Sequence, residues 1–113
     1  MNTSATNRTV NRGTPTPWIL KPKTKTEMFI EALICAGASG ITLTQLVAQM
    51  DNGRPNSCIA RLKKRGIWFR TQPNYAFHSQ SDAELALLVL NKMRQRRGSS
   101  PYPEEYIEGW INE

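Results

Sequence analysis

The chain has 113 residues, of which 39% are hydrophobic and 21% are charged. This length supports one folded domain with terminal extensions and excludes a large multi-domain enzyme. Fifteen Lys and Arg side chains against nine Asp and Glu give a net charge of +6 at pH 7, which favours an anionic partner.

The charge is unevenly distributed along the chain. Residues 1–103 hold all fifteen basic side chains and five acidic ones, a balance of +10, whereas residues 104–113 hold four acidic side chains and no basic one. A body this basic favours nucleic acid over a membrane surface, because no basic amphipathic helix with an aromatic apolar face is visible. Contact with RNA stays open as an alternative.

The two cysteines and the single histidine are too few for a zinc site. Cys35 and Cys58 each lie in an apolar helical context, so we expect two buried, reduced thiols and no metal or cofactor. The N-terminus lacks the apolar stretch of a signal peptide, and the longest apolar run, Leu85–Leu90, is far below the ~20 residues that span a bilayer. We therefore expect a cytoplasmic protein with no membrane partner.

The composition divides the chain into three parts. Residues 1–23 are rich in Thr, Asn and Pro without apolar periodicity, which predicts a disordered basic arm. Within the arm, Trp18–Leu20 form a short apolar patch that we expect to dock on the domain. Residues 24–97 should form the folded domain, and residues 98–113 should form an acidic C-terminal tail.

Apolar residues at three- and four-residue spacing predict a first helix over Thr26–Ala36, ended by Gly37 in a left-handed conformation. Gly40–Thr42 follow as a short extended link, and the Thr42 side chain should cap a second helix over Leu43–Met50. The side chains that this second helix is expected to bury are Leu43, Leu46, Val47 and Met50.

A polar turn, Asp-Asn-Gly-Arg, separates the second helix from the third, and Gly53 is expected to supply its positive φ. Proline is favoured in the first turn of a helix, so the third helix should span Pro55–Arg65. Gly66 then follows as the residue that ends the helix. Ile67 is placed to touch Leu62 in the hydrophobic contact of a Schellman ending.

Two β-rich runs, residues 67–71 and 75–78, flank a three-residue loop and predict a hairpin. In that loop Asn74 can take the left-handed conformation. Ser81 and Glu84 match a capping box, which predicts that a fourth helix begins at Asp82 and ends near Arg97.

Apolar residues wrap more than half the circumference of the helix over 82–97. This surplus favours a twofold homodimer formed through that helix. The alternative is a buried central helix, covered by Trp18–Leu20 and by the tail aromatics Tyr106 and Trp110. In the tail, residues 103–113 have the spacing of a short amphipathic helix.

The order helix, link, helix, turn, helix, hairpin, helix resembles the winged helix-turn-helix domain of bacterial and phage transcription regulators. The likeness is carried by Gly-Ile-Thr at Gly40–Thr42 and by IARLKKRGIWFR at Ile59–Arg70, which looks like the end of a recognition helix that leads into the first wing strand. The resemblance implies a mainly α fold with a three-helix core, a two-stranded wing and an extra C-terminal helix. It also implies a small transcriptional regulator, of the phage or mobile-element type, that binds double-stranded DNA sequence-specifically.

The third helix and the strand after it carry the candidate interface. Six basic residues and no acidic one lie between Arg54 and Arg70, which is the charge pattern of a surface laid against phosphates. In a major groove Arg61 is suited to guanine and Asn56 to adenine, and the cations near the helix end are suited to phosphate contact. The predicted DNA-binding residues are Arg54, Asn56, Ser57, Ala60, Arg61, Lys63, Lys64, Arg65 and Arg70.

No catalytic residues are predicted, because the chain has one histidine, no Gly-rich phosphate loop and no close acidic pair in a plausible cleft. We therefore do not expect an enzyme. A second hypothesis is an adaptor that uses the winged helix and the acidic, aromatic tail 103–113 to bind a polymerase, a nuclease or a repressor. RNA binding is a third hypothesis, favoured by the Arg- and Asn-bearing arm.

Overall fold

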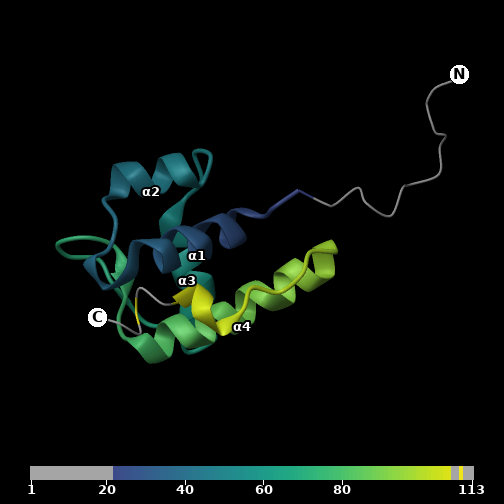
Figure 1. Ribbon diagram of the computed structural model, residues 1–113. Coiled ribbons are helices and arrows are strands. Elements are labelled where there is room, and N and C mark those ends of the chain that lie inside the picture. Colours follow the sequence, from purple (N-terminus) through teal and green to yellow (C-terminus); the bar gives the residue numbers. More distant parts are fainter. Residues whose placement is uncertain (1–21, 108–109, 111–113) are drawn as a thin grey trace, which may run out of the picture.

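The computed structural model describes residues 22–107 and Trp110. Within these residues the chain is mainly helical, with one small antiparallel sheet (Figure 1). The helices are α1 (Lys25–Ala36), α2 (Leu43–Gln49), α3 (Pro55–Lys63) and α4 (Gln80–Arg97). The shorter elements are the strands β1 (Phe69–Arg70) and β2 (Ala76–Phe77) and the 3-10 turns η1 (Gly37–Ser39) and η2 (Glu104–Ile107). Apart from its last two residues, the expected basic arm lies outside the described part, as does its patch Trp18–Leu20.

Helix α1 is the centre of the fold. The Thr24 side chain accepts a hydrogen bond from the Glu27 N–H at 3.2 Å and so begins the helix one residue before the predicted start. Phe29, Ile30 and Leu33 are fully buried, and α1 packs against α2, α3, α4, β2 and η2. Most of the hydrophobic core therefore depends on one short helix.

Helix α2 follows the predicted extended link and has the predicted cap. The Thr42 side chain accepts from the Gln45 N–H at 3.2 Å, and Ile41 forms an antiparallel bridge with Tyr75. Leu46 and Met50 are buried as expected. Leu43 is 49% exposed, so the prediction that it is buried is wrong, because it lies in the first turn of α2 on the side away from the core.

The turn between α2 and α3 differs from the prediction for Gly53. The positive φ angles belong to Asp51 (53°) and Asn52 (63°), two residue types that tolerate this conformation. Gly53 is needed for a different reason, because a Cβ atom there would lie 3.0 Å from the Cε and the carbonyl oxygen of Met50. The glycine lets the chain pass close to a buried methionine.

Helix α3 begins at Pro55 as predicted and ends at Lys63, two residues earlier than predicted. The Ile67 N–H donates to the Leu62 carbonyl at 3.2 Å, and the Gly66 N–H donates to the Lys63 carbonyl at 3.0 Å. Gly66 has a φ of 87°, and Leu62 and Ile67 are both fully buried. These bonds confirm the predicted Schellman ending.

The predicted hairpin forms, with strands shorter than expected. Phe69 is paired with Phe77 and Arg70 with Ala76. The left-handed conformation expected for Asn74 is wrong, because Asp51 and Asn52 are the only described residues other than glycine with a positive φ. Instead the Gln72–Pro73 peptide bond is cis, and the Asn74 side chain donates to the Ser39 carbonyl at 3.2 Å.

Helix α4 ends at Arg97 as predicted, but it begins at Gln80, two residues before the expected start. Its cap is Ser79, whose side chain accepts from the Asp82 N–H at 3.3 Å, so the capping box expected at Ser81 and Glu84 is wrong. A tertiary contact explains why Ser79, and not Ser81, caps the helix. Asp82 is buried and accepts a 2.8 Å hydrogen bond from the Trp68 N–H.

The C-terminal segment packs into the domain. Ile107 is fully buried and Trp110 is 7% exposed, with the Trp110 ring 6.2 Å from that of Phe77. The Asn91 side chain exchanges two hydrogen bonds, of 2.8 and 3.0 Å, with the backbone of Tyr102. The expected boundary at residue 97 is therefore not the end of the core.

This packing favours the second interpretation of α4, the buried central helix. Ala83, Ala86, Leu87 and Leu90 are covered by α1 and by the C-terminal segment. Leu85 and Leu88 are its large apolar side chains that stay exposed. Most of the apolar surface that had suggested a homodimer through residues 82–97 is buried within the chain itself. The dimer stays a prediction.

A buried ion pair joins α1 to the end of α4. The Arg97 guanidinium donates to both carboxylate oxygens of Glu27 over 2.9–3.1 Å. Glu27 is 1% exposed, and the Arg97 side chain is 9% exposed. This hydrogen bonding raises the pKa of Arg97 above its ordinary value.

Deleting residues 99–113 should lower the free energy of unfolding by about 3–6 kcal/mol, since each large apolar side chain that loses its burial costs about 1.5–3 kcal/mol. Urea denaturation followed by circular dichroism measures the loss. The double substitution Glu104→Gln and Glu105→Gln is the control, because it removes charge and leaves the buried residues in place. An unchanged urea midpoint for the deletion would show that the segment does not belong to the core.

Replacing Arg97 by Met should destabilise the fold by about 3–5 kcal/mol, because it leaves the Glu27 carboxylate buried without a partner. The double variant with Glu27→Leu and Arg97→Met should recover most of this loss, since no charge is then buried. Thermal denaturation of the three proteins compares them. Equal losses in the single and double variants would mean that packing, not charge, sets the cost.

Candidate nucleic-acid interface

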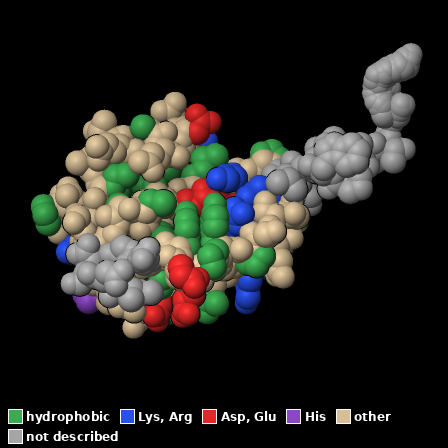
Figure 2. Space-filling model, in the orientation of Figure 1, with side chains coloured by type: hydrophobic (Ala, Val, Ile, Leu, Met, Phe, Trp, Pro, Cys, Tyr) green, Lys and Arg blue, Asp and Glu red, His purple; other side chains and the backbone are tan. Residues whose placement is uncertain are grey.

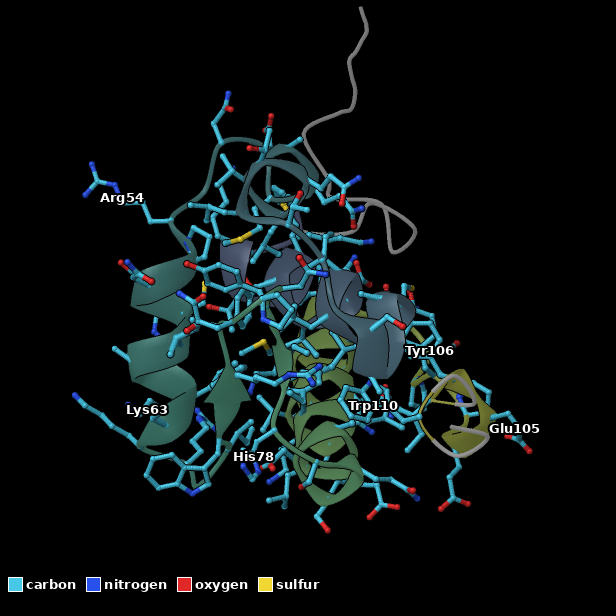
Figure 3. All side chains as sticks on the ribbon, turned by 90° about the vertical axis from the view of Figure 1, so that its left-hand side faces the viewer. Arg54, Lys63, His78, Glu105, Tyr106 and Trp110 are labelled. Atoms are coloured by element: carbon cyan, nitrogen blue, oxygen red, sulfur yellow. The ribbon has the colours of Figure 1, made fainter. Side chains whose placement is uncertain are left out.

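Helix α3 divides into an inner and an outer face as predicted. Pro55, Cys58 and Leu62 are buried, which anchors the helix on α1. The outer positions, all exposed, are Asn56, Ser57, Ala60, Arg61, Lys63 and Lys64. Figure 3 places Arg54 and Lys63 near the two ends of α3, with both side chains directed away from the body of the molecule. The helix thus offers a polar, cationic surface along its length.

Three described carboxylates form ion pairs, all with cations outside α3 and its flanks. Glu27 and Glu31 are on α1, and Asp51 is in the turn that follows α2. Their four ion pairs join Lys23 with Glu31, Lys25 with Asp51, Arg94 with Glu31, and Arg97 with Glu27. None of the six cations between Arg54 and Arg70 forms an ion pair with a described carboxylate. Their charge is therefore uncompensated within this part of the chain.

Arg61 makes a tertiary contact that the sequence did not predict. Its Nη1 atom donates to Thr26 Oγ1 on α1 at 2.9 Å. This bond holds the guanidinium at the flank of α3 that faces α1, away from the centre of the outer face. The contact joins residues 35 positions apart, so local sequence pattern contains no signal for it.

The other predicted residues keep their expected exposure. Arg70 is exposed, and its guanidinium donates to the Ala38 carbonyl of η1, which fixes the side chain beside the hairpin. Arg54, Lys64 and Arg65 are also exposed. Lys63 lies with its Nζ atom 5.5 Å from the centre of the Trp68 ring, a cation–π contact.

Trp68 is a surface residue that the sequence did not place in the interface. Its side chain is 57% exposed, and its backbone is fixed by the bond from its N–H to Asp82 and by a 3.0 Å bond from the His78 N–H to its carbonyl. The alternation with Phe69 was the available signal, since one of two successive strand residues must point away from the core. The ring extends the outer surface of α3 towards the hairpin.

The exposed acids of η2 lie on a different side of the molecule from α3. In Figure 3, Glu105 lies at the edge opposite to Arg54 and Lys63. Figure 2 shows acidic side chains gathered over η2 and the start of α4, where the exposed acids are Glu84, Glu104 and Glu105. The acidic C-terminal residues that the structure describes therefore do not screen α3.

Comparisons with family models, with curated proteins and with solved structures gave no match. In the described part of the chain, no group of three His, Cys, Asp or Glu residues is arranged to hold a metal ion. No helix described here is long and apolar enough to cross a membrane.

The two thiols should react at different rates. Cys58 is 3% exposed, and burial raises its pKa, whereas Cys35 is exposed, contrary to the expectation of two buried thiols. Because the thiolate is the reactive form, a chromogenic disulfide reagent should modify Cys35 quickly in the native protein and Cys58 only on unfolding. The variant Cys35→Ser should lack the fast phase. Two thiols that react equally fast would contradict the buried position of Cys58.

Proposed function

We propose that the chain binds double-stranded DNA as a winged helix-turn-helix protein, with α3 inserted in the major groove, and that it acts as a small transcriptional regulator. One observation carries the proposal: the exposed cations of α3 and its flanks have no described carboxylate partner, whereas Lys25 of α1 and Arg94 and Arg97 of α4 do. Like charges held together on one helix repel one another, and a polyanion relieves that repulsion.

The arrangement of the elements supports a winged helix-turn-helix fold. α2, a short turn, α3 and the β1–β2 hairpin follow one another directly, and α3 is held on α1 by its buried face. Its exposed face has no described element laid over it. An α-helix of ordinary diameter fits the major groove of B-form DNA.

The roles of individual residues follow from their places on α3. Asn56 and Ser57 are exposed in the first turn, where groove-inserted helices meet base edges, and the small Ala60 lets the helix approach closely. Lys63 and Lys64 lie at the end of the helix, where contact with phosphates is expected. We assign Arg61 to the flank of α3 and not to base recognition, because its guanidinium is bonded to Thr26.

Two other classes of partner, a protein and an RNA, suit the structure less well. The adaptor hypothesis relied on a tail whose apolar residues were available to another protein, and Ile107 and Trp110 are instead buried in this chain's own core. An RNA partner has the same phosphate chemistry, but A-form RNA has a deep, narrow major groove that side chains do not read. Duplex DNA is the partner that suits an exposed helix best.

Two substitutions on α3 should separate specificity from general affinity. Asn56→Ala should cost about 1–3 kcal/mol on a selected duplex and little on a scrambled one, because it removes a base contact. Lys64→Ala should weaken both duplexes alike and reduce the slope of log K against log salt by about 1. Fluorescence anisotropy on duplexes selected from a random library measures both effects.

The control for these variants is Lys92→Ala, which removes an exposed cation of α4 outside the proposed interface. It should leave affinity and salt slope close to those of the wild type. Equal losses for Lys92→Ala and Lys64→Ala would mean that net charge, not α3, determines binding. Equal competition by A-form RNA would overturn the assignment to duplex DNA.

A further inference from the structure

A cavity of about 270 Å³ lies where the first turn of α1, one flank of α3 and the last turns of α4 meet. It lies beside the outer face of α3, and Arg61 lines it from the flank of that helix. Its lining includes the side chains of Thr26, Glu27, Arg61, Met93, Arg96 and Arg97. Residues from three helices thus converge on one small space.

The charge of this cavity is positive. Three arginines and one glutamate line it, and the Glu27 carboxylate is already bound by Arg97 through both of its oxygens. The charges of Glu27 and Arg97 neutralise each other. Arg61 and Arg96 then give the cavity a net charge of two positive units. A guanidinium has five N–H donors, and Arg61 gives one of them to Thr26.

We propose that this cavity binds a phosphate group, held by the guanidinium groups of Arg61 and Arg96. A planar guanidinium matches two oxygens of a phosphate at once, and two such groups match the charge of a dianion. The bond to Thr26 orients Arg61 before any ligand arrives. Thr26 is itself 1% exposed and contacts Cys58 at 3.8 Å, so the support for Arg61 is rigid.

The size and the apolar lining of the cavity limit the ligand. Pockets for small molecules are typically about 300–1,000 Å³, so this one is suited to a phosphate, or to a phosphate on a small organic group that touches Met93. Such a phosphate has two sources. It belongs either to the backbone of DNA bound along α3 or to a free phosphorylated compound.

Titration with inorganic phosphate at constant ionic strength, followed by amide ¹H–¹⁵N spectra, tests the site without DNA. Saturable shifts are expected for residues 24–27 and 93–97. Arg96→Gln should weaken phosphate binding at least tenfold, whereas Lys92→Gln, a neighbouring cation on α4 outside the cavity, should bind as the wild type does. Absence of saturable shifts, or equal affinities in these two variants, would overturn the proposal.

Arg61→Gln should also weaken phosphate binding, again with Lys92→Gln as the control. Arg61→Gln also loses the bond to Thr26. Its spectrum outside the cavity must therefore match that of the wild type, which shows that the fold is unchanged. If it does not, Arg96→Gln, which loses no described hydrogen bond, decides the question. Arg97 is not substituted in this test, because its loss would leave Glu27 unpaired.

A duplex distinguishes the two sources. If the backbone of DNA supplies the phosphate, a bound duplex displaces inorganic phosphate, and Arg96→Gln reduces the salt slope of DNA binding by about 1. If a free compound supplies it, duplex and phosphate bind together and the slope is unchanged. The phosphate titration contains no DNA, so its result does not depend on the proposed function. Absence of phosphate binding and absence of DNA binding are therefore separate outcomes.

Discussion

The buried carboxylate of Glu27 is the constraint on which the arrangement of charge in this fold depends. It lies in the first turn of the central helix, 1% exposed, and a buried carboxylate without a partner would cost several kcal/mol. Arg97 meets it from the last turn of α4 and thereby fixes how α4 crosses α1. The end of an 18-residue helix is therefore placed by one ion pair and not by apolar packing alone.

This use of acidic residues has a consequence for α3. Residues 1–103 contain five acidic side chains, and three of them form the ion pairs of α1, α4 and the turn after α2. A fourth, Asp82, is buried at the start of α4, where it binds the Ser79 hydroxyl and the Trp68 N–H. Four of the five acids of residues 1–103 are thus engaged elsewhere in the fold, and the cations of α3 have no acidic partner among the described residues.

Local chemistry allowed much of the fold to be predicted from sequence, because a capping residue acts on its own helix. Thr42, Pro55 and Gly66 mark helix ends through bonds or angles within a few residues, and the structure has them in these roles. Ser79 and Ser81 each have an acid three residues later, so the pattern alone could not choose between them. The choice depends on a contact from the hairpin to Asp82, which no local pattern contains.

Local sequence pattern likewise predicted some features of the candidate site, and tertiary contacts determine the others. The outer face of α3 followed from helical periodicity, because Cys58 and Leu62 had to turn inward. The position of the Arg61 guanidinium did not, since Thr26 lies 35 residues away. The exposure of Trp68 was half predicted, because alternation required one outward residue and packing decided which one.

The position of the C-terminal segment keeps its acidic side chains away from α3. Ile107 and Trp110 cover the core on the side of η2, and Figure 3 places Glu105 across the molecule from Arg54. Acids held there cannot fold back onto α3 without withdrawing those side chains from the core, so they lower the net charge without neutralising the basic face. A separation of this kind orients an approaching polyanion towards α3 and repels it from η2. The net charge of +6 is therefore the sum of a basic surface on α3 and an acidic region at η2, and it does not describe either one.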